Sequence, residues 1–216
     1  MYDIIPKTTG SRRPNEVHFE KRGPTAFPLI RPKAEQVTFN STNITGLDAS
    51  KVIRLGIGHV LEGMRVFSTL SVEDNLMLGA YGRKLVRPDS LQTVFKYFPI
   101  LERKRRQLAG SLSGGEKQML AIARTLMCEL KLLLLDEPPA GLAPLLVKRL
   151  FEILSDLRKE YDLTILLVKQ KVEIALGFAD RGMVLAQGQI MLEGEAASLA
   201  KDPEVKRICL REGAVC

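Results

Sequence analysis

Short apolar runs alternate along the chain with segments whose apolar residues recur at helical spacing. Leu132–Leu135 and Thr164–Val168 are nearly uninterrupted apolar runs, typical of strands that are buried on both faces of a parallel sheet. Between them, residues 144–158 carry an apolar residue every three or four positions, which predicts an amphipathic helix. Its apolar face consists of Leu146, Leu150, Ile153, Leu154 and Leu157. Strands that alternate with helices predict an α/β sandwich.

The same patterns predict further elements on both sides of this core. Gln36–Asn40 and Ile57–Val60 have the length and composition of short strands, and residues 71–127 have mainly helical spacing, which predicts a helical lobe inserted between strands. Residues 172–179 are expected to form another helix. Residues 183–192 flank Gln187-Gly188 with apolar residues, as in a β-hairpin.

The first 33 residues differ from the rest. They contain five prolines and no apolar periodicity, and proline interrupts both helices and central strands. We therefore predict a largely irregular arm there. The prolines are Pro6, Pro14, Pro24, Pro28 and Pro32.

Composition narrows the class of protein. With 216 residues of which 45% are hydrophobic, the chain can bury the core of one domain. No apolar run approaches the roughly 18 to 20 residues of a membrane span, and the first ten residues lack a signal-peptide pattern, so we expect a soluble cytosolic protein. Three scattered cysteines and two histidines argue against a disulfide framework and a zinc site.

The net charge of +7 raises the question of nucleic acid. The densest basic run, Arg103–Arg106, is not accompanied by a series of stacking aromatics or by a nucleic-acid motif. We interpret this run as a solvated helix end and expect no nucleic-acid partner. A basic surface would also suit a protein held near an anionic membrane face.

Two motifs about twenty residues apart carry the chemistry. In Leu112–Glu116 (LSGGE), Ser113 can cap the helix that follows while the glycines leave the backbone bare, and such a helix start binds anions. In Leu132–Glu137 (LLLLDE), Asp136 and Glu137 follow a buried strand, where α/β sheets place their ligands. Alone, a Ser-Gly-Gly sequence is usually a turn and a hydrophobic run before Asp-Glu is often a plain strand end; together, the two motifs predict a phosphate site.

These motifs resemble the signature and Walker B motifs of ATP-binding subunits of ABC transporters. The nearest branch is that of the branched-chain amino-acid importers, whose F-type subunits carry strings similar to Arg54–Val60, Glu73–Tyr81 and Ile165–Val168. The resemblance covers about residues 29–210. It implies a P-loop NTPase sandwich with a helical subdomain at about 64–128, in an ABC ATPase domain at 29–216 that follows an arm at 1–28.

The resemblance also implies roles for single residues. The signature binds the γ-phosphate of ATP held by the opposite subunit, through Ser113, Gly114, Gly115 and Glu116. Asp136 is implied as the Mg²⁺ ligand and Glu137 as the residue that polarises the attacking water, since phosphoryl transfer depends mainly on positioning and charge stabilisation.

Two further positions carry unusual residues. Glu62 occupies the Q-loop position, where most of the family has glutamine, and Gln170 occupies the H-loop position, where most has histidine. We interpret both as marks of this branch and assign Gln170 a catalytic role. From local sequence alone, Gln170 is equally well a surface residue after a strand.

One motif of the family, the P-loop, is missing from this sequence. A P-loop has the pattern G-x-x-x-x-G-K-S/T, and none of the 17 glycines here precedes a lysine. Counting back from Leu29–Lys33 places His18, Phe19 and Glu20 on the family's glycine, lysine and threonine. A reading-frame error is one hypothesis, because codons for Gly-Lys-Thr read one base off can give Glu-Lys-Arg, the residues at 20–22.

The resemblance therefore implies an ATP-binding subunit that uses ATP and Mg²⁺ in a head-to-tail dimer with a second ABC subunit. Transmembrane permease subunits would hold it on the cytoplasmic face of the cell membrane, and hydrolysis would energise import of branched-chain amino acids. The alternatives are a regulatory or interaction subunit that cannot bind ATP in its own P-loop, a decayed fragment, and an ABC ATPase unconnected with transport.

Overall fold

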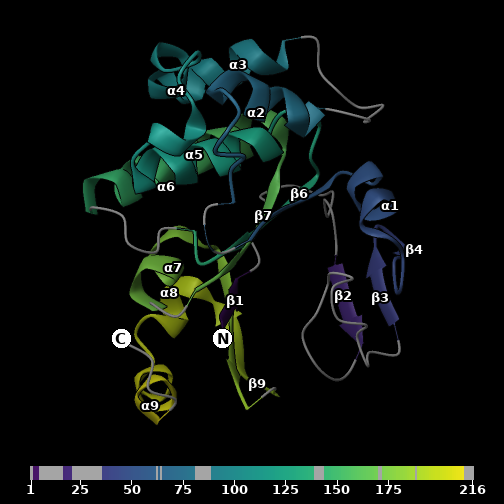
Figure 1. Cartoon of the computed structure of the whole chain (residues 1–216). Helices are drawn as coiled ribbons and strands as arrows, with labels where there is room; N and C mark the ends of the chain where they lie inside the picture. The colour runs from purple at the N-terminus through teal and green to yellow at the C-terminus, as the bar shows by residue number, and fades with distance from the viewer. Residues whose placement is uncertain are drawn as a thin grey trace. The chain divides into compact units, whose positions relative to one another are not determined.

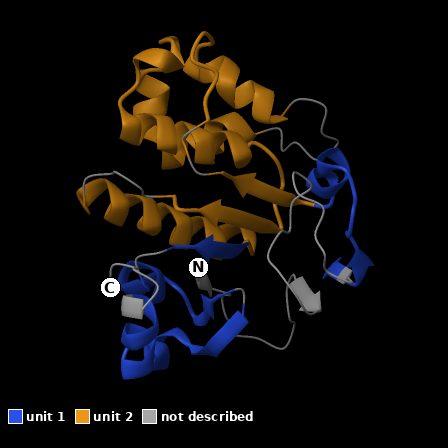
Figure 2. Ribbon diagram, turned by 60° about the horizontal axis from the view of Figure 1, so that its bottom comes forward, with its two compact units in different colours: residues 1–55, 164–216 blue, residues 56–163 orange. Residues whose placement is uncertain are grey.

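The computed structural model in Figure 1 shows helices alternating with strands, which confirms the predicted α/β class. The chain divides into two compact units, residues 56–163 and residues 1–55 with 164–216 (Figure 2). The structure describes residues 2–4, 17–20, 36–61, 63, 65–80, 89–138, 144–169, 172–187 and 189–211.

Two parallel strands form the core of the unit at residues 56–163. β5 (Ile57–Val60) pairs with β6 (Leu132–Asp136), with Ile57 opposite Leu132 and Val60 opposite Leu135. All four leucines of β6 are buried. This pairing confirms both predicted strands and their parallel arrangement. A run of four leucines indicates such a strand because it can be accommodated only where both faces of the strand are covered.

The other regular elements described in this unit are helical, as predicted for residues 71–127. The helical stretch is divided into several short helices, and Pro99 begins one of them, at a position where proline is favoured. The helical elements of the unit are α2 (Val72–Ala80), α3 (Ser90–Tyr97), α4 (Pro99–Arg103), the 3₁₀ turn η1 (Ala109–Ser111), α5 (Gly114–Thr125) and α6 (Pro144–Tyr161).

α6 confirms the predicted amphipathic helix and extends three residues beyond the predicted end. Four residues of the predicted apolar face are buried, whereas Leu146, in the first turn, is only half-buried. The apolar face is thus shorter than the spacing alone indicated. The buried residues are Leu150, Ile153, Leu154 and Leu157.

α2 packs against α5 at a position that requires glycine. A Cβ atom added to Gly79 would lie 2.0 Å from the carbonyl oxygen of Arg124, far inside van der Waals contact. The carbonyl of Gly79 also accepts a hydrogen bond from the thiol of Cys128, at 3.1 Å. The two helices therefore approach at backbone distance, which fixes α5 against α2.

The other unit contains an antiparallel group of four strands. β1 (Tyr2–Ile4) pairs with β7 (Thr164–Val168) and with β8 (Arg181–Ala186), and β8 forms a hairpin with β9 (Gln189–Glu195). The predicted hairpin is confirmed. The strand predicted at residues 164–168 is confirmed with the same bounds, but it is covered less completely than β6: Ile165 and Leu167 are buried, in alternation with half-buried residues.

A second, smaller sheet in this unit is antiparallel, with the order β2 (Val17–Glu20), β3 (Gln36–Phe39), β4 (Thr42–Asn43). β3 confirms the strand predicted at residues 36–40, and Asn40 and Ser41 form the turn after it with φ of 48° and 63°. The helices of the unit are α1 (Ala49–Arg54), α7 (Val172–Phe178), α8 (Ala196–Leu199) and α9 (Pro203–Arg211).

The first 33 residues contain two strands, β1 and β2, although we predicted a largely irregular arm. The prolines that led to this prediction lie outside both strands. Each strand is three or four residues long and receives its hydrogen bonds from distant partners, which local sequence does not reveal. The domain boundary at residue 28 and the subdomain limits stay predictions.

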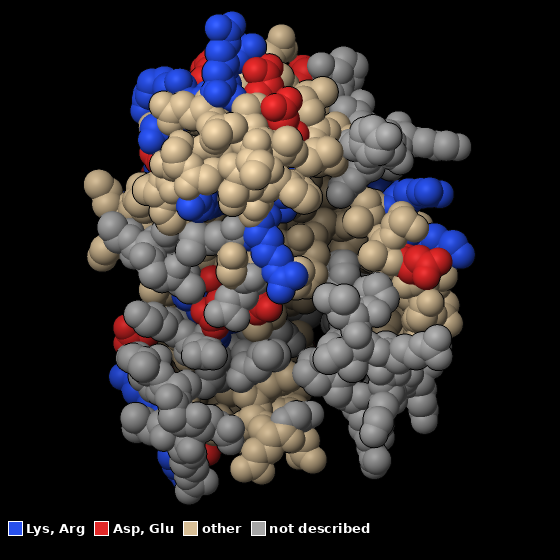
Figure 3. All heavy atoms as spheres, in the orientation of Figure 1, with Lys and Arg blue, Asp and Glu red and all other residues tan. Residues whose placement is uncertain are grey.

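Charges of both signs share the surface. At the top of the view in Figure 3, Lys and Arg side chains lie beside acidic ones. Across the parts of the chain that the structure describes, we find no helix that combines the length and the apolar character needed to span a bilayer.

Candidate functional site

The start of α5 confirms the predicted cap. Ser113 has extended backbone angles, and its hydroxyl oxygen accepts a hydrogen bond from the amide of Glu116 at 3.4 Å. In return, the Glu116 carboxylate accepts one from the amide of Ser113 at 3.0 Å. This reciprocal pair is a capping box, and the sequence Ser-Gly-Gly-Glu specifies it because it has the S-x-x-E spacing.

The capped start of α5 can receive an anion from outside the chain. Ser113 and Gly114 are exposed, whereas Gly115 is buried. The amides of the two glycines lie in the first turn, where helix N–H groups have no partner within the helix and the helix dipole favours negative charge. These residues therefore fit an external phosphate.

Lys104 is a residue of this site that sequence reasoning missed. It is the C-terminal cap of α4, and its ammonium lies 2.7 Å and 2.9 Å from the two carboxylate oxygens of Glu116. Burial opposes ionisation of Glu116, but the hydrogen bonds from Lys104 and Ser113 outweigh it and lower the pKa of this carboxyl. The prediction that Arg103–Arg106 is a solvated helix end is wrong for Lys104, whose side chain is only 28% exposed.

The neighbouring arginine ties the same segment to α2. Arg105 binds the carboxylate of Glu73 through two nitrogens, at 3.1 Å and 3.2 Å, and its carbonyl accepts a hydrogen bond from the amide of Glu73 at 3.0 Å. The only available signal in the sequence was four consecutive basic residues shortly before the LSGGE motif. Pattern alone cannot identify their carboxylate partners, because Glu73 is 32 residues away from Arg105.

Asp136 and Glu137 lie at the carboxyl end of β6, as predicted. Asp136 is the last residue of the strand, and Glu137 follows it with φ of 46°, in the left-handed region. Both are half-buried. Among the described residues, no group of three His, Cys, Asp or Glu side chains is arranged to hold a metal, so Mg²⁺ at Asp136 would need further ligands from phosphate oxygens and water.

The two motifs lie on different elements of one unit. Ser113 and Glu116 make their hydrogen bonds with each other and with Lys104 at the start of α5, whereas Asp136 and Glu137 are placed by β6. Glu62 and Gln170 lie outside the described residues, and their predicted roles stay predictions.

The segment after Glu62 is held from two sides. The side chain of Asn75, fully buried on α2, accepts a hydrogen bond from the amide of Phe67 and donates one to its carbonyl, both at 2.9 Å. Arg124 of α5 donates to the carbonyl of Arg65 at 2.6 Å and lies over the Phe67 ring. α5 therefore carries the capping box at one end and holds residues 65–67 at the other.

The residues counted onto the P-loop form a strand. In β2, His18 pairs with Thr38, Phe19 with Val37 and Glu20 with Gln36 of β3. A P-loop needs successive backbone amides that turn toward one phosphate group, whereas the amides of a strand point alternately to either side. These residues do not fit the phosphates of ATP.

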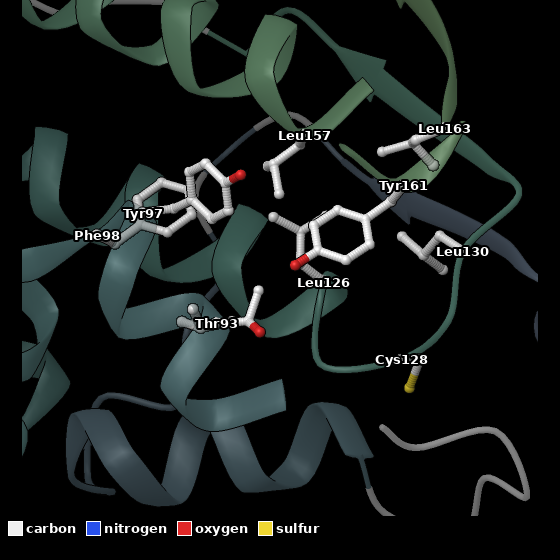
Figure 4. A pocket seen from close by; sticks show the side chains of 10 residues that line it. Thr93, Tyr97, Phe98, Leu126, Cys128, Leu130, Leu157, Tyr161 and Leu163 are labelled. Atoms are coloured by element: carbon white, nitrogen blue, oxygen red, sulfur yellow. The ribbon is translucent and has the colours of Figure 1, made fainter. Parts of the chain in front are cut away.

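A small hollow in the unit at residues 56–163 is a poor alternative site for a nucleotide. Its lining, shown in Figure 4, comes from α3 and α6, from residues that follow each of these helices, and from the segment between α5 and β6, and it includes no charged side chain. Burial raises the pKa of Tyr97, and the hydrogen bond that its hydroxyl donates to Glu160 raises it further. The lining residues are Thr93, Val94, Tyr97, Phe98, Leu126, Cys128, Leu130, Leu157, Tyr161 and Leu163.

Comparison with known proteins gives a consistent result. A family model described as ABC transporter matches residues 27–140, a span that includes both motifs. The high-affinity branched-chain amino acid transport ATP-binding protein BraG of Pseudomonas aeruginosa is 42% identical over 174 residues, which are 79% of this chain and 73% of BraG. A protein of Archaeoglobus fulgidus named as a probable branched-chain amino acid transport ATP-binding protein, LivF, is 36% identical over 186 residues, 85% of this chain and 78% of LivF.

A solved structure of an ABC transporter cassette resembles this chain in fold. The ADP conformation of MJ1267, an ATP-binding cassette of an ABC transporter, superposes with a TM-score of 0.68 and 27% identity, covering 82% of this chain and 78% of that one. The likeness extends over most of both chains, so it concerns the domain as a whole.

Proposed function

Because this chain belongs to the ABC transporter family of ATP-binding proteins, we propose that it is an ATP-binding subunit of an importer for branched-chain amino acids. The relatives named above carry that role in their names. One observation in the structure carries the proposal: the start of α5 presents Ser113 and Gly114 to solvent in a capped, anion-binding geometry.

The role of this chain is to complete a partner's site. In head-to-tail dimers of the family, each signature faces the nucleotide that the other subunit holds. The Ser113 hydroxyl and the amides of Gly114 and Gly115 donate to the γ-phosphate there, beside Glu116. ATP supplies the phosphoryl group whose hydrolysis energises transport.

The chain's own half-site is incomplete. With β2 in place of a P-loop, Asp136 and Glu137 have no phosphates held by the same chain. Their family roles, Mg²⁺ ligand and water-polarising carboxylate, together with those of Glu62 and Gln170, apply only if another chain supplies the phosphates. We therefore propose a heterodimer with one working site, in which this chain contributes the signature.

The remaining organisation follows from the same family membership. Residues 29–216 form the ABC domain, with a helical subdomain at about 64–128 and an arm at 1–28. Transmembrane permease subunits hold the dimer on the cytoplasmic face of the membrane. The β2 strand also favours a second candidate, a regulatory subunit that joins the complex and supports no hydrolysis.

Co-expression with a cassette that has a complete P-loop tests the proposal. That cassette should carry a glutamate-to-glutamine change after its Walker B aspartate, which traps the ATP-bound state. We expect a heterodimer by size-exclusion chromatography with light scattering in ATP, and none without nucleotide. Ser113→Arg should abolish it, whereas Ser198→Arg, at an exposed position of α8, should not.

Transport and regulation are separated by a second measurement. Proteoliposomes that contain the permease and both cassettes, with the partner's glutamate intact, should take up leucine only when ATP is enclosed. Dimer formation without uptake or hydrolysis would favour the regulatory subunit. Absence of any ATP-dependent dimer would contradict both.

A further inference from the structure

Lys104 contacts the signature from a different helix. Its ammonium reaches both oxygens of Glu116, at 2.7 Å and 2.9 Å, and the two side chains are 28% and 17% exposed. This pair is more shielded than the pair of Lys96 and Glu160 in the same unit, which lie 3.2 Å apart with exposures of 63% and 42%.

The backbone around Lys104 is held in place. The next residue, Arg105, binds Glu73 through its guanidinium and through its carbonyl. Two residues further on, the carbonyl of Gln107 accepts a hydrogen bond from the amide of Val72 at 2.9 Å. α2 therefore fixes the position from which Lys104 reaches the signature.

The contact orients the groups that face a phosphate. Glu116, held by Lys104, accepts from the amide of Ser113, while the Ser113 oxygen accepts from the amide of Glu116. The Ser113 side chain also helps to lower the pKa of the Glu116 carboxyl, and its hydroxyl hydrogen can rotate from that carboxylate to an external acceptor. Lys104 also compensates a negative charge that would otherwise stand beside an anion-binding helix start.

We propose that Lys104 is a positioning residue for the signature: by neutralising and orienting Glu116, it presents Ser113 to the phosphate of a partner's nucleotide. This inference rests on the proposed function. It assigns to the segment between α4 and η1 a part in nucleotide recognition, although Lys104 itself does not touch the nucleotide.

A purely structural role predicts different results. Partly exposed ion pairs contribute little to stability, so loss of the pair alone should change neither folding nor binding much. A charge-compensating role predicts that removal of the Glu116 charge rescues the loss of Lys104. Glutamine at position 116 keeps the capping box, since the motif accepts glutamate or glutamine.

The test uses the ATP-dependent heterodimer described above and measures the ATP concentration for half-maximal assembly. Lys104→Ala should raise it roughly tenfold, the effect of losing one charge-assisted interaction. Lys104→Arg should stay within about threefold of wild type, and Lys104→Ala/Glu116→Gln should recover most of the loss. Lys96→Ala is the matched control and should assemble at the same ATP concentration as wild type. All of these variants should unfold at the same temperature as wild type.

A second measurement does not need the partner. Hydrogen exchange of the Ser113 amide in the isolated full-length chain, followed by NMR, should accelerate in Lys104→Ala and return to the wild-type rate in Lys104→Arg. If wild type forms no ATP-dependent dimer, the proposed function fails, and the exchange rates still decide the role of Lys104. Unchanged exchange in Lys104→Ala, or a double variant no better than Lys104→Ala, overturns the inference.

Discussion

The start of α5 carries the signature motif, and the strand β2 contains the residues that the count along the sequence places on the P-loop; the two regions differ completely. At α5, Ser113 and Glu116 satisfy each other's amides, which leaves the amides of two glycines in the first helical turn without a partner in the capping box. At β2, the backbone of residues 17–20 pairs with β3. One region is built to bind an anion, and the other is built to hold a sheet.

The difference follows from the residues themselves. Anion binding by backbone needs several N–H groups that point the same way, which glycine permits and a helix start provides. Val17–Glu20 contains no glycine, and its valine and phenylalanine favour a strand. A chain can therefore keep the half of the site that serves a partner and lose the half that serves itself.

The largest expected contrast concerns nucleotide binding by the isolated chain. Calorimetry should detect no ATP binding in the micromolar range, because no P-loop gathers the phosphates; any dissociation constant should be weaker than about 1 mM. BraG, measured under the same conditions, provides the reference. Micromolar ATP binding by this chain would contradict the conclusion that residues 17–20 cannot serve as a P-loop.

A charge at the start of α5 should disable the intact region. Gly114→Asp places a carboxylate where the partner's phosphate would lie, and like-charge contacts cost several kcal/mol, so ATP-dependent heterodimer assembly should weaken roughly 10²- to 10³-fold. Thermal stability should be unchanged or slightly higher, since acidic residues suit helix starts. Gly114→Asn introduces an uncharged side chain of the same size as aspartate and is the control. If Gly114→Asn weakened heterodimer assembly as much as Gly114→Asp, side-chain size and not charge would be the cause.

The support behind α5 should be sensitive to a single methyl group. Gly79→Ala would place a Cβ atom 2.0 Å from the carbonyl of Arg124, and overpacking against backbone should cost about 3 kcal/mol of unfolding free energy. Gly177→Ala in α7, where nothing lies within 4 Å, should be neutral or stabilising. Urea unfolding measures both, and equal stability of the two variants would contradict the close packing of α2 and α5.

Acid should weaken the unit that carries both motifs by a smaller amount. Burial lowers the pKa of His59 on β5 from 6.5 to about 4, so between these values the unfolded chain binds a proton that the folded one excludes. Stability should therefore be full above pH 6.5 and fall as the pH drops toward 4. Urea unfolding at pH 7 and pH 5 should show a smaller decrease in His59→Gln; an identical decrease would rule out His59 as the cause.

The parts of the site that the sequence predicted are those set by neighbouring residues. Four consecutive residues, Ser113 to Glu116, determine the capping box, and four leucines before Asp136 determine a covered strand end. Lys104 could not be assigned, because its partner depends on how α4 meets α5. β2 was missed for a similar reason: its hydrogen bonds come from β3, sixteen or more residues further along the chain.

The backbone at Glu137 has a consequence for the history of this chain. A residue with a side chain at φ of 46° is strained, by an amount of order 1 kcal/mol that glycine would relieve. In a lineage released from any use of this carboxylate, substitution by glycine or asparagine would be accepted and even favoured. Sequencing this codon in close relatives that have the same residues 17–20 therefore tests whether the carboxylate is still used: a retained glutamate indicates that selection acts on it.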